Sequence, residues 1–123
     1  RSAATSDPTS HGEVEAIRDA CRRLSVTSLK GADLYTSGEP CSMCVATMYQ
    51  VGIKRLFYAG AASDSAAFFQ RLAAHDPKWT RSLSNQQLRH QVGLPLDERE
   101  MAAEQVLREG ILDVYEAFIE RHT

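Results

Sequence analysis

The chain has 123 residues, of which 43% are hydrophobic and 24% charged, and its formal net charge is −2. This length fits one small domain, and the hydrophobic fraction argues against an intrinsically disordered chain. No apolar run approaches the roughly 18 residues that a membrane-spanning helix needs. A small negative net charge is not typical of a protein that binds long nucleic acids, although it does not exclude a local basic patch. We therefore expect a single domain over residues 1–123.

Helical and strand patterns alternate along the first half of the chain. The expected elements are a helix over residues 11–24, a strand over 33–37, a helix over 41–50 and a strand over 53–59. A strand, a helix and a strand in succession predict two parallel strands joined by a right-handed crossover. Further helices are expected over 66–74, 85–91 and 109–121.

These elements indicate an α/β fold, but two strands alone make a poor sheet. Either further strands come from a partner or part of the domain precedes Arg1, and we favour the second.

Two predicted helix starts carry side chains that bind metals. Cys41 and Cys44 are three residues apart, so they share one face of the first helical turn. The positive end of the helix dipole favours the thiolate form, which is the form that binds a metal. His11 begins the other helix and offers an imidazole. Two sulfurs and one nitrogen leave the fourth tetrahedral position of Zn²⁺ open, as in catalytic sites.

Glu13 has two interpretations. Ser10 and Glu13 have the spacing of a capping box, in which the glutamate only closes the helix start. Alternatively, the carboxylate lies beside a zinc site and moves protons between a water molecule and a substrate. Both His11 and Glu13 can reach one site only at the first turn, because residues two apart in a regular helix point about 200° apart.

The cysteine pair also has other interpretations. A Cys-x-x-Cys pair can be a thioredoxin-like redox pair or half of a structural zinc site. The remaining cysteine, Cys21, is a poor fourth ligand, because ten helical residues place it about 15 Å along the axis from His11. An odd number of cysteines does not suit a secreted disulfide framework, so we expect a reducing, cytoplasmic setting.

Together the two segments form a known signature. His11-Gly-Glu13 followed by Pro40-Cys-x-x-Cys44 resembles the cytidine deaminase-like zinc deaminases, whose signature is H-x-E…P-C-x-x-C. The wider segments over residues 7–18 and 35–44 are most similar to the bacterial guanine deaminase branch. The similarity covers residues 5–60 well and the rest of the chain loosely.

The resemblance implies a three-layer α/β/α fold around a mixed sheet of about five strands, of which this chain lacks the N-terminal helix and first strands. It also implies that His11, Cys41 and Cys44 bind Zn²⁺ and that Glu13 shuttles protons between a catalytic water and the substrate. The reaction would replace an amino group on a nucleobase with oxygen and release ammonia.

The resemblance further implies two substrate-binding positions. The backbone N–H of Gly12 would hold a substrate carbonyl group, although relatives usually carry alanine there. Asn85 aligns with one of the acidic residues that read the purine edge in guanine deaminases, and an amide can donate as well as accept. A guanine-like purine is the favoured substrate, and Asn85 leaves that specificity open.

Other functions remain open at this point. One is deamination of tRNA adenosine, or of a cytosine base or nucleoside, against which the net acidity counts modestly. Another is a catalytically silent domain that zinc only stabilises. The family resemblance also implies a homodimer. No membrane partner is expected, because no apolar run is long enough to span a bilayer.

Overall fold

The computed structural model describes residue 7, residues 9–80 and residues 83–123. The chain forms two compact units, Arg1–Val92 and Gly93–Thr123. Whether these act as the single domain expected from the sequence stays a prediction. In the part of the chain that is described, no helix combines the length and the apolar character needed to span a membrane.

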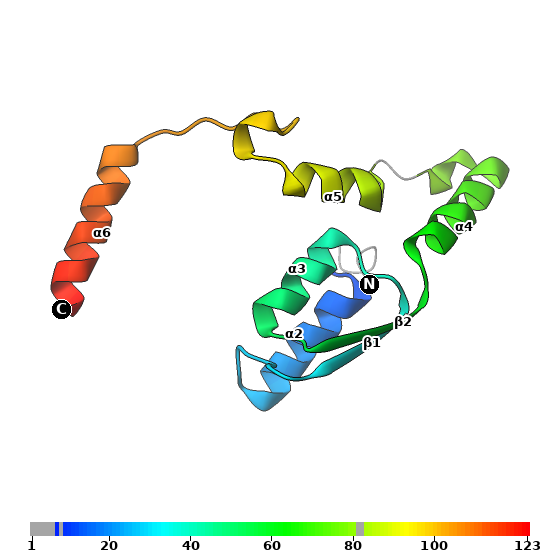
Figure 1. Ribbon diagram of the computed structural model, residues 1–123, viewed down its shortest axis with the longest axis horizontal. Helices are drawn as coiled ribbons and strands as arrows, with labels where there is room; N and C mark the ends of the chain where they lie inside the picture. The colour runs from blue at the N-terminus through cyan, green and yellow to red at the C-terminus, as the bar shows by residue number, and fades with distance from the viewer. Residues whose placement is uncertain (1–6, 8, 81–82) are drawn as a thin grey trace. The chain divides into compact units, whose positions relative to one another are not determined.

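The helices and strands follow the order expected from the sequence, with ends that differ by a few residues. In chain order they are α2 (Gly12–Leu24), β1 (Asp33–Gly38), α3 (Ser42–Val51), β2 (Arg55–Gly60), α4 (Ala62–His75), the 3₁₀ turn η1 (Pro77–Trp79), α5 (Asn85–Gly93), the 3₁₀ turn η2 (Leu96–Glu98) and α6 (Arg108–His122). Figure 1 shows them along the chain. The expected α/β class is confirmed.

The sheet consists of β1 and β2, which are parallel and in register from the pair Asp33–Arg55 to the pair Gly38–Gly60. The Arg55 guanidinium donates to both carboxylate oxygens of Asp33, at 3.1 and 2.9 Å, and so fixes the first pair of the register. The mixed sheet of about five strands that the resemblance implied is not formed by the described residues, which contribute these two strands.

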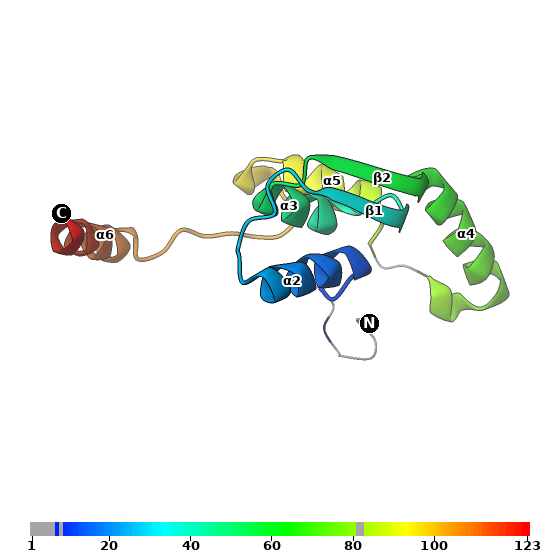
Figure 2. The same ribbon diagram turned by 90° about the horizontal axis from the view of Figure 1, so that it is seen from below.

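The core of the first unit is formed where α2 and α3 pack against the sheet (Figures 1 and 2). Ile17 of α2 and both Met48 and Val51 of α3 are buried, and Leu34 and Leu56 of the two strands pack against them. Because Leu34 and Leu56 are opposite each other in the register, one face of the strand pair meets both helices. This packing holds the starts of α2 and α3 at the same end of the sheet.

The start of α2 differs from the capping box expected at Ser10 and Glu13. The N-cap residue is His11, and no side chain caps the helix. The Ser10 hydroxyl instead donates to Glu15 at 2.7 Å, and the Glu13 carboxylate accepts from Thr36. The capping-box prediction is therefore wrong, because both of its side chains have closer partners away from the helix backbone.

The start of α3 lies one residue later than expected. Cys41 is the N-cap, in extended conformation, and the helix begins at Ser42. The helix ends at Val51, one residue later than expected, and its C-cap residue Gly52 has a φ of 85°. An added Cβ there would lie 3.1 Å from the Lys30 backbone, whereas one at Gly31, which has the same φ, meets no atom within 4 Å.

We predict that Gly52→Ala lowers the free energy of unfolding by about 2–3 kcal/mol, because it combines left-handed strain with a backbone clash. Gly31→Ala is the matched control and should cost about 1 kcal/mol, since it adds strain alone. Urea unfolding of both variants measures the difference. Equal losses would show that contact with the Lys30 backbone does not limit residue size at position 52.

Candidate functional site

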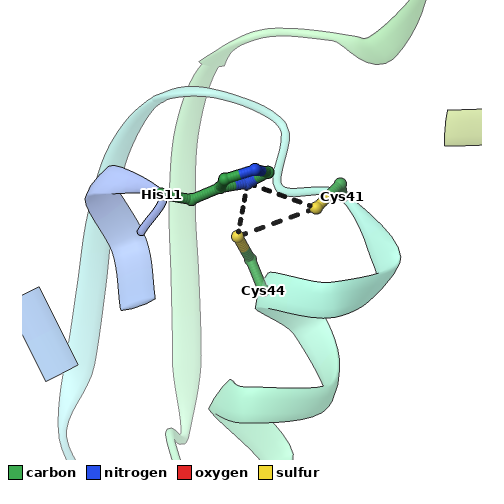
Figure 3. Close-up of side chains that lie close together, drawn as sticks. All are labelled: His11, Cys41 and Cys44. Atoms are coloured by element: carbon green, nitrogen blue, oxygen red, sulfur yellow. Dashed lines mark hydrogen bonds between the residues drawn. The ribbon is translucent and has the colours of Figure 1, made fainter. Parts of the chain in front are cut away.

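The three side chains predicted to bind a metal, His11, Cys41 and Cys44, come together at the starts of α2 and α3. We call these three residues the metal-type group. His11 precedes the first residue of α2, Cys41 precedes the first residue of α3, and Cys44 lies on the first turn of α3. Figure 3 shows the three side chains pointing toward one another from these two helix ends. Two positive helix-dipole ends therefore face two sulfur atoms, an arrangement that favours thiolates.

The spacing of the three donor atoms fits a tetrahedral zinc ion. His11 Nδ1 lies 3.7 Å from Cys41 Sγ and 3.5 Å from Cys44 Sγ, and the two sulfurs are 3.7 Å apart. Tetrahedral ligands at usual zinc bond lengths would be about 3.8 Å apart for two sulfurs and about 3.6 Å apart for sulfur and nitrogen. No fourth His, Cys, Asp or Glu of the described residues joins the group.

The protein environment of Cys44 also fits a cation. Its side chain is 1% exposed, and its pKa is raised by burial, by the neighbouring Cys41 sulfur and by the Glu13 carboxylate. Each of these effects disfavours a thiolate, and a bound cation would offset all of them. The donor set and its charge environment therefore fit Zn²⁺.

The remaining cysteine does not belong to the group. Cys21 is partly buried and packs against Ile17, Met48 and Val51, the buried core residues. This agrees with the expectation that it is a poor fourth ligand.

Glu13 lies beside the metal-type group. One carboxylate oxygen, Oε1, accepts a hydrogen bond from the Thr36 hydroxyl at 2.8 Å, and the other, Oε2, accepts from the Cys44 thiol at 3.5 Å. Burial raises the pKa of Glu13, but the hydrogen bond from Thr36, a backbone hydrogen bond, the contact with Cys44 and the nearby His11 together leave it lowered. The group is therefore a carboxylate near neutral pH and able to accept a proton.

Thr36 is a site residue that the sequence analysis missed. It follows Leu34 by two residues on β1, so both side chains are on the face of the strand that meets the helices. A polar residue on the buried face of a strand, near its carboxyl end, is the signal that could have indicated a site residue. The sequence does not show its partner, Glu13, which is 23 residues away.

A cavity of about 480 Å³ adjoins the metal-type group. Its lining combines both N-cap residues of the site with apolar and polar side chains from α3, α5 and the segment before α5: His11, Cys41, Met43, Thr80, Leu83, Ser84, Asn85 and Leu88. A volume of this order is typical of small-molecule sites, as is an apolar lining with a few polar groups.

Of the two predicted substrate-binding residues, Gly12 and Asn85, one lines the cavity and the other does not. Asn85 lines the cavity, and its side-chain oxygen accepts a hydrogen bond from the Ser42 backbone N–H at 3.2 Å. Gly12 is the exposed first residue of α2. Its N–H belongs to the first helical turn, where backbone donors have no partner within the helix. Gly12 is not among the residues that line the cavity.

Comparison with known protein families identifies a deaminase family. Residues 1–105 match the model of the MafB19-like deaminase family, and the chain belongs to this family. The resemblance to the cytidine deaminase-like deaminases that the two motifs indicated is thereby confirmed.

The individual relatives include deaminases of two different substrates. The chain is 47% identical over 62 residues to guanine deaminase of Bacillus subtilis, covering 50% of this chain and 40% of the relative. It is 40% identical over 75 residues to a tRNA-specific adenosine deaminase of Agrobacterium fabrum, covering 56% and 49%. The chain thus spans less than half the length of these curated relatives.

A solved structure is similar over a longer stretch. The X-ray structure of guanine deaminase from Bacillus subtilis matches 97% of this chain and 68% of its own chain, at 30% identity and a TM-score of 0.75. This similarity supports the guanine deaminase branch as the place of the chain within the superfamily.

We predict that Cys44→Ser lowers zinc affinity by more than about 100-fold, since losing a ligand exceeds the usual loss from removing an outer-shell partner. Cys21→Ser is the matched control and should keep one zinc per chain, because Cys21 is outside the group. Chelator competition and metal analysis of the purified variants measure both. Equal zinc content in the two variants would contradict the assignment of Cys44 as a ligand.

Proposed function

We propose that the chain is the catalytic part of a zinc-dependent hydrolytic deaminase that converts an amino-substituted nucleobase to its oxo form and releases ammonia. The observation that carries this proposal is the position of Glu13: a partly buried carboxylate beside two sulfurs and an imidazole with the spacing of zinc ligands. A purely structural zinc site has no use for a proton acceptor at that position.

His11, Cys41 and Cys44 would hold the zinc ion, which when bound makes water a nucleophile near neutral pH. Glu13 accepts one proton from the attacking water and delivers it to a ring nitrogen, then takes the second proton from the newly attached hydroxyl and delivers it to the leaving amino group. Water supplies the oxygen, and the amino group leaves as ammonia. The backbone N–H of Gly12, unpaired within the helix, is available to hold a substrate carbonyl group.

Thr36 has a positioning role in this proposal. Its hydroxyl holds Oε1 of Glu13, which directs the carboxylate and leaves Oε2 on the side of Cys44. Its hydrogen bond also lowers the pKa of Glu13, which keeps the proton acceptor ionised.

A guanine-like purine is the favoured substrate, and the similarity to guanine deaminase supports it. The second candidate is tRNA adenosine, which the relative from Agrobacterium fabrum supports; a cytosine base or nucleoside is a third. Ammonia release from guanine, cytosine, cytidine and an anticodon stem-loop separates them. Activity confined to the stem-loop would replace guanine by tRNA adenosine as the substrate.

Assembly and location belong to the same proposal. We expect a homodimer, on the family resemblance, and sedimentation as a monomer at low concentration would contradict it. We also expect a cytoplasmic location, because two zinc-binding cysteines are kept reduced there. Oxidised Cys41 and Cys44 in protein taken from cells would contradict that expectation.

We predict that Glu13→Gln lowers kcat by about 10²–10⁴-fold, the range for losing a general acid–base group, while zinc content and fold stay unchanged. Zinc analysis and circular dichroism of the same preparation provide the control. Unchanged turnover would favour a catalytically silent domain, in which zinc only stabilises the protein.

We predict that Thr36→Val lowers kcat by about tenfold and moves the acidic limb of the pH–rate profile to higher pH. The sign follows because the Thr36 hydroxyl stabilises the Glu13 carboxylate, so its removal raises the pKa of Glu13. Thr47→Val is the matched control, since the Thr47 hydroxyl donates to the Met43 carbonyl within α3, away from Glu13. Equal profiles for the two variants would show that Thr36 does not position Glu13.

A further inference from the structure

The Asn85 side chain is held in one orientation by a backbone donor. The Ser42 N–H is the first of α3, where the helix supplies no acceptor, and it donates to Asn85 Oδ1 at 3.2 Å. Only the oxygen of an amide can accept this hydrogen bond, so the orientation of oxygen and nitrogen is chemically determined. The Nδ2 amino group is the part of the amide that remains for other partners.

The backbone of Asn85 is held as well. Ser84 and Gln87 form a reciprocal cap at the start of α5: the Ser84 N–H donates to the Gln87 side chain at 2.9 Å, and the Gln87 N–H donates to the Ser84 hydroxyl at 3.1 Å. Asn85 is the first residue of α5, next to this cap. Asn85 is therefore held both at its backbone, by the cap, and at its side-chain oxygen, by the Ser42 N–H.

Asn85 lines the cavity that also contains His11 and Cys41. It also lines a second cavity of about 580 Å³. The two cavities share Thr80, Ser84 and Asn85 as lining residues. Among the described residues, none accepts a hydrogen bond from Nδ2 of Asn85. A molecule bound in the cavity beside His11 and Cys41 therefore lies next to Asn85, whose amino group is the part of the amide left to donate.

We propose that Asn85 selects substrates as a donor: its amino group reads a carbonyl oxygen or an unprotonated ring nitrogen on an amino-substituted heterocycle. This rests on the proposed deaminase function and specifies its substrate class. A carboxylate at the same place would accept instead, and would select a ring N–H or an amino group. The Ser42 N–H is thus the group that sets which hydrogen-bonding edge the site reads.

Asn85→Asp tests the proposal, because it exchanges Nδ2 for an oxygen and keeps an oxygen for the Ser42 N–H. Aspartate is also favourable in the first turn of a helix, so α5 should form normally. The 123-residue chain is assayed with each base that it deaminates and with analogues of that base in which one acceptor is removed, a ring nitrogen replaced by C–H or a carbonyl by CH₂.

For the wild-type chain we expect one analogue to lose about 10- to 100-fold in kcat/KM, the range for a lost hydrogen bond that leaves a donor unpaired. In Asn85→Asp the preference for the parent base over that analogue should disappear. Gln86→Glu is the matched control: it adds the same charge one residue further on, at a residue that lines the second cavity but not the one beside His11 and Cys41. It should keep the wild-type preference. An unchanged preference in Asn85→Asp overturns the proposal.

Ser42→Pro tests the cause of the orientation. Proline lacks the N–H, is favoured at the first position of a helix, and follows an extended residue well, as Cys41 is with φ −74° and ψ 172°. The amide of Asn85 is then free to turn, so the preference should fall severalfold with zinc content unchanged. A preference equal to that of the wild-type chain would show that Ser42 does not set the orientation.

A measurement without substrate separates failure of this inference from failure of the proposed function. The Ser42 amide proton should be protected from hydrogen exchange in the wild-type chain and in Asn85→Asp, and lose protection in Asn85→Ala. A chain that deaminates none of the bases contradicts the proposed function, whatever the exchange shows. Equal Ser42 protection in all three proteins contradicts the inference, whatever the activity.

Discussion

The site depends on one constraint, the parallel pairing of β1 and β2. Parallel strands need a crossover, and α3 is that crossover, so its start lies at the carboxyl end of β1. Packing of Ile17 against Met48 and Val51 brings α2 alongside α3. The two helix starts then meet, and with them the side chains that fit a zinc ion. Ligands of open α/β sheets bind at this end of the strands for the same reason.

Signals that are local in the sequence predicted much of this arrangement. The three-residue spacing of Cys41 and Cys44 depends on one helix, and the structure places both at the start of α3, as expected. His11 and Glu13 needed the family motif as well, because residues two apart share a site only at a helix start. The α/β class followed from the order of the periodic segments.

Features that depend on contacts between distant segments could not be predicted. Thr36 matters because β1 places its hydroxyl against a carboxylate on α2, and no spacing in the sequence records that distance. The same contact explains the wrong capping box, since Glu13 has a partner on the sheet and Ser10 has one in Glu15. The orientation of Asn85 also depends on a donor 43 residues away. In each case tertiary contacts outweigh a local preference.

Cys44 belongs both to the metal-type group and to the hydrophobic interior, since it is the most completely buried side chain among the described residues. Without a cation, a thiol, a second sulfur and a partly buried carboxylate would be crowded together, which is the environment that raises the pKa of Cys44. The free energy of metal binding is therefore part of the free energy of folding. In a protein built in this way, loss of a bound cation raises the unfolded fraction that proteases remove, so abundance follows metal supply.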